Sequence, residues 1–63
     1  MLNFKTSDQL RNERSVLRSC IKDCKDEIKQ ARLAHDDVWA QQLLYAIHVY
    51  RKEIEQIDAA LEA

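Results

Sequence analysis

Eight consecutive residues, 43–50, contain a single strongly polar side chain, that of His48. The chain has no Gly and no Pro, so nothing in this run favours a turn, and a helix is expected. Such a helix is apolar around nearly its whole circumference, whereas packing against one core requires only an apolar stripe. A chain of 63 residues has little else to cover the remaining side. The run therefore predicts a partner, most simply a second copy of the chain.

Two segments carry apolar residues at the alternating spacing of a packed helix seam. The two seams are out of phase, so one straight coiled coil cannot include both, and the phase breaks near residues 34–37. Thr6 followed by Gln9 has the spacing of a capping box at the start of a first helix. Asp36 or Asp37 can cap a second helix. The first seam consists of Leu10, Leu17, Ile21, Cys24, Ile28 and Ala31, with Arg14 as a weak point, and the second of Leu43, Ile47, Tyr50, Ile54, Ile57 and Leu61.

These patterns predict a mainly α fold with a single small domain over residues 1–63. We expect a helical hairpin with helices at about 7–33 and 37–62, assembled as an intertwined homodimer. A kink at 34–37 is the alternative to a hairpin turn, because helix ends usually recruit Gly or Pro. The alternation of Leu2 and Phe4 with polar neighbours predicts a short strand at about 2–5, paired with a symmetry mate. The alternative there is a frayed terminus whose Phe4 covers the core.

Composition narrows the class of protein. Charged residues make up 33% of the chain and hydrophobic ones 46%, which favours folded helices over disorder. The net charge of −1 gives no overall attraction to nucleic acid or membrane. No stretch is long and apolar enough for a membrane span, and we expect a cytoplasmic protein with reduced thiols. Chains shorter than roughly 70–80 residues seldom stabilise themselves with a core alone, and two cysteines form at most one bridge, so a dimer is favoured.

The cysteines and histidines offer a weak case for chemistry. Cys20 and Cys24 share one helix face and, with His35 and His48, could in principle bind zinc, although the spacing is not a usual zinc signature. The simpler interpretation is a pair of core thiols. His48 could be a ligand, a pH switch or a base, or simply a hydrogen-bonded residue at the edge of an interface. Neither histidine has a Ser, Asp or Glu at a recognisable catalytic offset. We therefore expect no enzyme activity, no cofactor and no metal.

A continuous basic line follows the first helix. Residues 5–33 hold eight basic and five acidic residues, a net charge of +3, while the remainder holds two basic and six acidic residues, a net charge of −4. The line could contact RNA or DNA phosphates. The alternative is a solvated face that complements the acidic second helix. The possible nucleic-acid contacts are Arg11, Arg14, Arg18, Lys22, Lys25, Lys29 and Arg32.

The second helix also has apolar residues beyond its seam. Leu44, Tyr45 and Val49 have no expected partner within one chain, and exposed apolar patches of this kind mark interaction surfaces. We expect a dimer that leaves a groove for the amphipathic helix of a partner protein. The residues predicted to build the dimer and partner interface are Leu2, Phe4, Trp39, Leu43, Leu44, Tyr45, Ile47, Val49 and Tyr50.

In its length, its "MLNFK" start, its two helices and its aromatic-rich "VWAQQLLYAIHVY" segment, the chain resembles one group of phage proteins. These are the small early lytic-development proteins encoded between the exonuclease and excisionase genes of lambdoid temperate phages. The resemblance implies a homodimer with two helices and one strand per chain, made early in infection. It also implies a regulatory role that favours lysis over lysogeny by engaging a host or phage protein through an apolar cleft. The family has no known catalytic residues.

Overall fold

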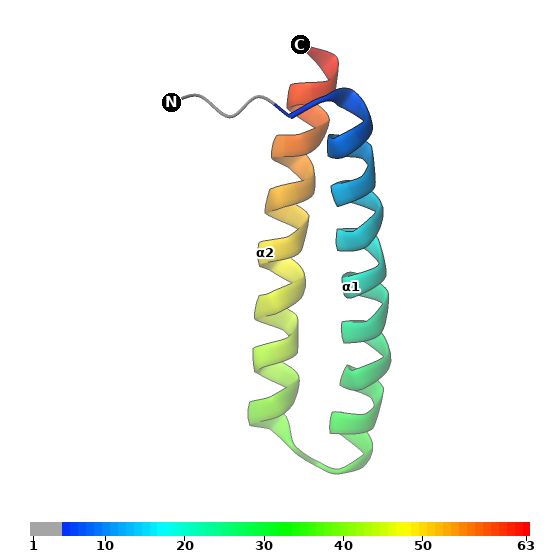
Figure 1. The fold of residues 1–63 in the computed structure, drawn as a ribbon. Helices are drawn as coiled ribbons and strands as arrows, with labels where there is room; N and C mark the ends of the chain where they lie inside the picture. Colours follow the sequence, from blue (N-terminus) through cyan, green and yellow to red (C-terminus); the bar gives the residue numbers. More distant parts are fainter. Residues whose placement is uncertain (1–4) are drawn as a thin grey trace.

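The structure, a computed structural model, describes residues 5–63. Two long antiparallel helices, α1 (Ser7–Leu33) and α2 (Asp37–Glu62), form a hairpin in which α1 begins at the same end of the molecule at which α2 ends (Figure 1). The chain measures 45 × 20 × 18 Å, and its radius of gyration of 14.5 Å exceeds the roughly 10.6 Å of a compact domain of this length. The helical hairpin and both sets of predicted helix bounds are confirmed. The strand predicted at about 2–5 lies outside the described residues except for Lys5, which has no regular structure.

The start of α1 is fixed by side chains that satisfy its free backbone donors. The Gln9 amide donates to Thr6 Oγ1 at 3.2 Å, and the Thr6 amide donates to Gln9 Oε1 at 2.9 Å. These two reciprocal bonds are the predicted capping box. Asp36 caps α2 with a single bond of this kind, since its Oδ1 accepts from the Trp39 amide at 3.0 Å.

The connection between the helices is a hairpin turn rather than a kink. His35 has φ 55°, the left-handed conformation that usually requires Gly after a helix. This conformation lets the Asp36 amide donate to the Ala31 carbonyl at 2.8 Å and the His35 amide donate to the Arg32 carbonyl at 3.1 Å. This pair of bonds is the Schellman motif that ends many helices. The turn at 34–37 is therefore made without Gly because His35 takes the strained position.

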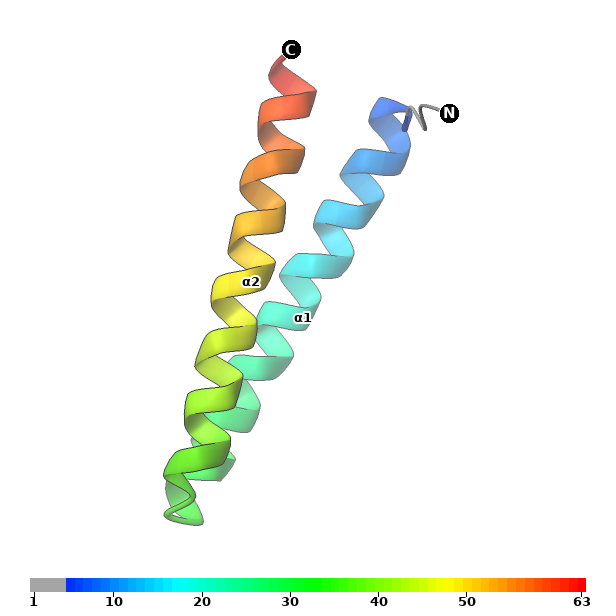
Figure 2. The same ribbon diagram turned by 90° about the vertical axis from the view of Figure 1, so that its left-hand side faces the viewer.

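The core is thin and concentrates near the turn. Figure 2 shows the two helices close together there and diverging toward the ends of the chain. Ala31, completely buried, lets the backbones approach closely, whereas the first-half seam residues Leu10 and Leu17 are only partly buried. Both predicted seams face the partner helix of the same chain. Within residues 5–63, the buried apolar residues are Ile28, Ala31, Leu43, Ile47 and Ile57.

Arg14, the weak point of the first seam, contributes an interhelical ion pair. Its guanidinium donates to Asp58 Oδ1 at 2.7 Å, and the Arg14 side chain is only 26% exposed. The pair joins the basic helix to the acidic one, as the complementary charges of the two helices predict. It takes the place of an apolar contact in the half of the hairpin where the helices diverge, and Ile57 is the buried apolar residue that the structure describes there.

Candidate interaction surface

An apolar line on α2 remains uncovered by the hairpin. Val38 and Tyr45 are 69% and 70% exposed, and Val49 is partly exposed. They are seven and four residues apart, which places them on one side of the helix. We call Val38, Tyr45 and Val49 the tyrosine stripe. Their exposure agrees with the expectation that the second helix has more apolar surface than α1 can cover.

The tyrosine stripe continues into a groove at the diverging end of the hairpin. From Val49, steps of four, three and four residues lead to Glu53, Gln56 and Ala60, which form the α2 wall of this groove. The space has a volume of ≈ 630 Å³ and is open to solvent. We call it the terminal groove. Its α1 side and floor are formed by Leu10, Asn12, Glu13, Val16, Leu17 and Ile57, with Lys5 at its mouth.

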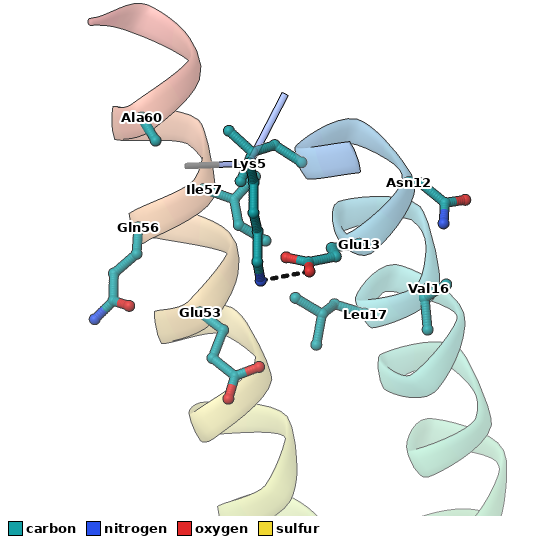
Figure 3. A pocket seen from close by; sticks show the side chains of 10 residues that line it. Lys5, Asn12, Glu13, Val16, Leu17, Glu53, Gln56, Ile57 and Ala60 are labelled. Atoms are coloured by element: carbon teal, nitrogen blue, oxygen red, sulfur yellow. Dashed lines mark hydrogen bonds and ion pairs between the residues drawn. The ribbon is translucent and has the colours of Figure 1, made fainter. Parts of the chain in front are cut away.

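Figure 3 shows how the side chains are arranged in the terminal groove. Leu17 and Glu53 project toward each other from opposite helices, and Lys5 reaches across to form an ion pair with Glu13 (Figure 3). Val16 is 55% exposed, so the wall formed by α1 also presents apolar surface. The groove therefore combines an apolar floor with polar groups at its edges, as is usual for sites that bind a helix or a side-chain anchor.

The residues predicted for the dimer and partner interface differ in how far the hairpin itself buries them. Leu43 and Ile47 are buried in the core of the hairpin itself, and Tyr50 is partly buried. Trp39 lies beside the turn and remains 37% exposed. Leu2 and Phe4 lie outside the described residues.

Leu44 is separated from the tyrosine stripe. Successive helical residues point about 100° apart, so Leu44 and Tyr45 cannot share a face. Leu44 instead lines a second groove, on the flank of α2 that faces the basic line of α1. The sequence pattern grouped the two residues because both are apolar and surplus to the seam. The separation could have been read from the helical period alone.

The structure divides the predicted basic line into two parts. Arg14 pairs with Asp58, and Arg11 lies 4.0 Å from Asp8, so the half near the ends of the chain is partly neutralised. Lys25, Lys29 and Arg32 line the second groove, whereas Arg18 and Lys22 line neither groove. Arg51 of α2 joins them because the register between the helices brings it there, and periodicity within one helix does not indicate this neighbour.

The cysteines are both free and partly buried, and Cys24 packs against the core. Burial, then the nearby charge of Glu27, raises the pKa of the Cys24 thiol, so its reactive thiolate is scarce at neutral pH. Within residues 5–63, no three of the His, Cys, Asp and Glu side chains gather closely enough to hold a metal ion. His48 is exposed on α2, and His35 occupies the turn.

No family model, no curated protein and no solved structure matches this chain. Of the helices in the described part of the chain, neither is both long and apolar enough to cross a membrane.

Proposed function

We propose that this chain is a non-enzymatic regulatory module that forms a homodimer and binds another protein. The observation that carries the proposal is the tyrosine stripe, an exposed apolar line on a chain whose own core is small. Tyr45 alone leaves most of a large aromatic side chain in water. Exposed apolar surface of this kind is usually covered by a partner.

The size of the core supports self-association. Fully burying an Ile or Leu side chain contributes about 1.5–3 kcal/mol, and the hairpin buries only four such residues, Ile28, Leu43, Ile47 and Ile57. Ordering a chain of this length opposes folding with a much larger conformational entropy. A second copy seated on the tyrosine stripe supplies the missing apolar contacts, and folding and association are then coupled.

The terminal groove gives the proposed dimer a place to receive a partner. Its Leu17 and Ile57 floor suits the apolar face of an amphipathic helix. At its edges, Glu13 and Glu53 suit polar or basic residues of the same helix.

A finer proposal follows from the resemblance of the sequence to small early phage proteins. The regulated process is then lytic development, the partner is a host or phage protein, and the protein acts in the host cytoplasm. The non-enzymatic character is supported by the sequence, in which no nucleophile, base and orienting group stand at a recognisable spacing.

Binding to RNA or DNA through the basic line is the second candidate. It is favoured by Lys25, Lys29 and Arg32, which form no ion pair with the described residues. It is weakened by the pairing of Arg14 with Asp58, which breaks the line that phosphates would follow.

The dimer proposal is tested by the concentration dependence of thermal unfolding, followed by circular dichroism. A coupled dimer has a melting temperature that rises with protein concentration. Tyr45→Glu is expected to lower the melting temperature and the helicity at micromolar concentration, because it places a charge in the proposed interface. Ser19→Glu adds the same charge to an exposed site on α1 and serves as the control.

Equal effects of the two substitutions, or a melting temperature independent of concentration, would contradict the proposal. Capture of partners from a host lysate by wild type but not by Leu17→Glu, with the dimer retained, would support the role of the terminal groove.

A further inference from the structure

The second groove lies between the turn-proximal halves of α1 and α2. Four basic side chains form its rim, and three apolar side chains form its floor and wall. We call it the cationic groove; its volume is ≈ 340 Å³. The basic residues are Lys25, Lys29 and Arg32 of α1 and Arg51 of α2.

Positive charge is concentrated at the cationic groove because no acidic side chain lines it. None of its four basic residues forms an ion pair with any residue from 5 to 63. This contrasts with the other end of the hairpin, where Asp58 and Asp8 neutralise the arginines. The unpaired cations raise the local potential and favour an anionic occupant.

The floor of the cationic groove is apolar. Ile28 and Ile47 form it and are already buried, while Leu44 is 43% exposed. Covering the remaining surface of Leu44 removes further apolar area from water and therefore favours binding. An occupant that matches both features needs an apolar side chain flanked by negative charge.

We infer that the cationic groove binds an acidic amphipathic helix of a partner protein. The rim residues Lys25, Lys29 and Arg32 follow at steps of four and three, so they extend along about 10 Å of α1. Carboxylates spaced by four and three residues on a partner helix have the same repeat and can face them. The partner's apolar residue then covers Leu44. The inference rests on the proposed function only in taking the partner to be a protein, and it does not depend on the dimer.

The same features do not favour nucleic acid. The floor has no aromatic ring on which a base can stack. Among the described residues, the run of unpaired cations, which also includes Arg18 and Lys22, ends at the Arg14–Asp58 pair, whereas phosphate binding gains affinity from many contacts along the backbone. A partner helix of about two to three turns matches the length of the rim better than an extended nucleic-acid backbone does.

The inference is tested by fluorescence anisotropy with a labelled, capped synthetic helix of about 14 residues. The probe carries Glu at positions matching the rim and Leu between them, and a second probe has Lys in place of every Glu. We expect the acidic probe to bind at least about tenfold more tightly than the basic one at low salt, and to lose affinity as salt is raised.

Substitutions in the groove identify the site. Lys25→Glu with Lys29→Glu is expected to weaken binding of the acidic probe by about tenfold, since two ion pairs become repulsions. The matched control, Arg18→Glu with Lys22→Glu, makes the same change on the same line outside the groove and should alter affinity less than about twofold. If the charge reversal lowers helicity, Lys25→Gln with Lys29→Gln should still weaken binding by about threefold.

The apolar floor is tested separately by Leu44→Gln against Leu33→Gln. Leu33 is also exposed but lines neither groove, so only the Leu44 change should weaken binding, by about threefold to fivefold. Equal binding of the acidic and basic probes, or equal loss in groove and control variants, would overturn the inference.

Three further outcomes separate this inference from the other proposals. Labelled RNA or duplex DNA that binds more tightly than the acidic probe, and loses affinity on Lys25→Glu with Lys29→Glu, would assign the groove to nucleic acid and overturn the inference. Dissociation of a wild-type dimer by that variant would assign the groove to a second copy and would also overturn it. A monomeric wild type that binds the acidic probe would support it while contradicting the proposed dimer.

Discussion

Replacing His35 with Gly should stabilise the protein. His35 is the non-Gly residue with positive φ in the described chain, at 55°, and it provides the turn on which the hairpin depends. In this conformation a Cβ atom lies too close to the following carbonyl oxygen. His35→Gly removes that contact while leaving the hydrogen bonds of the His35 and Asp36 amides in place.

The expected gain is the difference between two effects. A left-handed conformation costs a non-Gly residue about 1–2 kcal/mol. Gly at the same site gives the unfolded chain more conformational freedom, which costs about 0.4–1 kcal/mol. The net increase in the free energy of unfolding is then about 0.5–1 kcal/mol, or about 3–6 °C in the melting temperature of a domain of this size.

The measurement is urea denaturation followed by circular dichroism at a fixed protein concentration, so that association does not shift the midpoint. His35→Ala is the matched control, because it removes the imidazole ring but keeps the Cβ atom. His35→Val should destabilise, since a branched side chain tolerates positive φ poorly. A variant with Gly that is no more stable than the one with Ala would refute the conformational argument.

Other predictions address the seam, the cap and the thiols. Arg14→Leu extends the apolar seam and should leave stability unchanged or raised, whereas Asp58→Asn should cost about 0.5–1 kcal/mol in the free energy of unfolding; a double-mutant cycle with the two changes measures their coupling. Thr6→Ala should cost about 1 kcal/mol through loss of the capping box, measured by urea denaturation. Because burial raises the pKa of the Cys24 thiol, a variant that retains only Cys24 should react with a maleimide more slowly at neutral pH than one that retains only Cys20. The rate of the Cys24 reaction should increase as the pH rises above 9.0. The pKa of the Cys24 thiol is 9.0 in the unfolded chain and higher in the folded one. The stability that this difference contributes is fully present below pH 9.0 and is lost as the pH rises through the folded-state pKa. The urea midpoint should fall accordingly. Equal maleimide rates for the two thiols would contradict the burial of Cys24.

Most of the hairpin was predictable from the sequence because the starts of its helices and the position of its turn have local causes. The Thr6 and Gln9 pair and the Asp36 cap set where the helices begin, and the change of phase between the seams places the turn. The absence of Gly was the one feature that favoured a kink at 34–37 over a hairpin turn. The residues around His35 do not predict its left-handed conformation, because packing of the two seams against each other imposes it.

The grooves were less predictable because they depend on how the helices pair. The terminal groove exists because small Ala31 draws the helices together near the turn while Arg14 occupies a seam position at the other end. The cationic groove requires Arg51 to lie opposite Lys25 and Lys29, which depends on the register between helices far apart in sequence. Apolar periodicity predicts which residues face a partner helix, but not the angle or register at which the helices meet.

The central claim is that the tyrosine stripe is covered by a second copy of the chain. Sedimentation equilibrium of the unmodified protein at micromolar concentration tests it most directly. A mass of twice the 7.4 kDa of one chain, together with a helical spectrum, is the predicted result. A stably folded species of 7.4 kDa at that concentration would contradict the claim, because the exposed stripe would then need no partner.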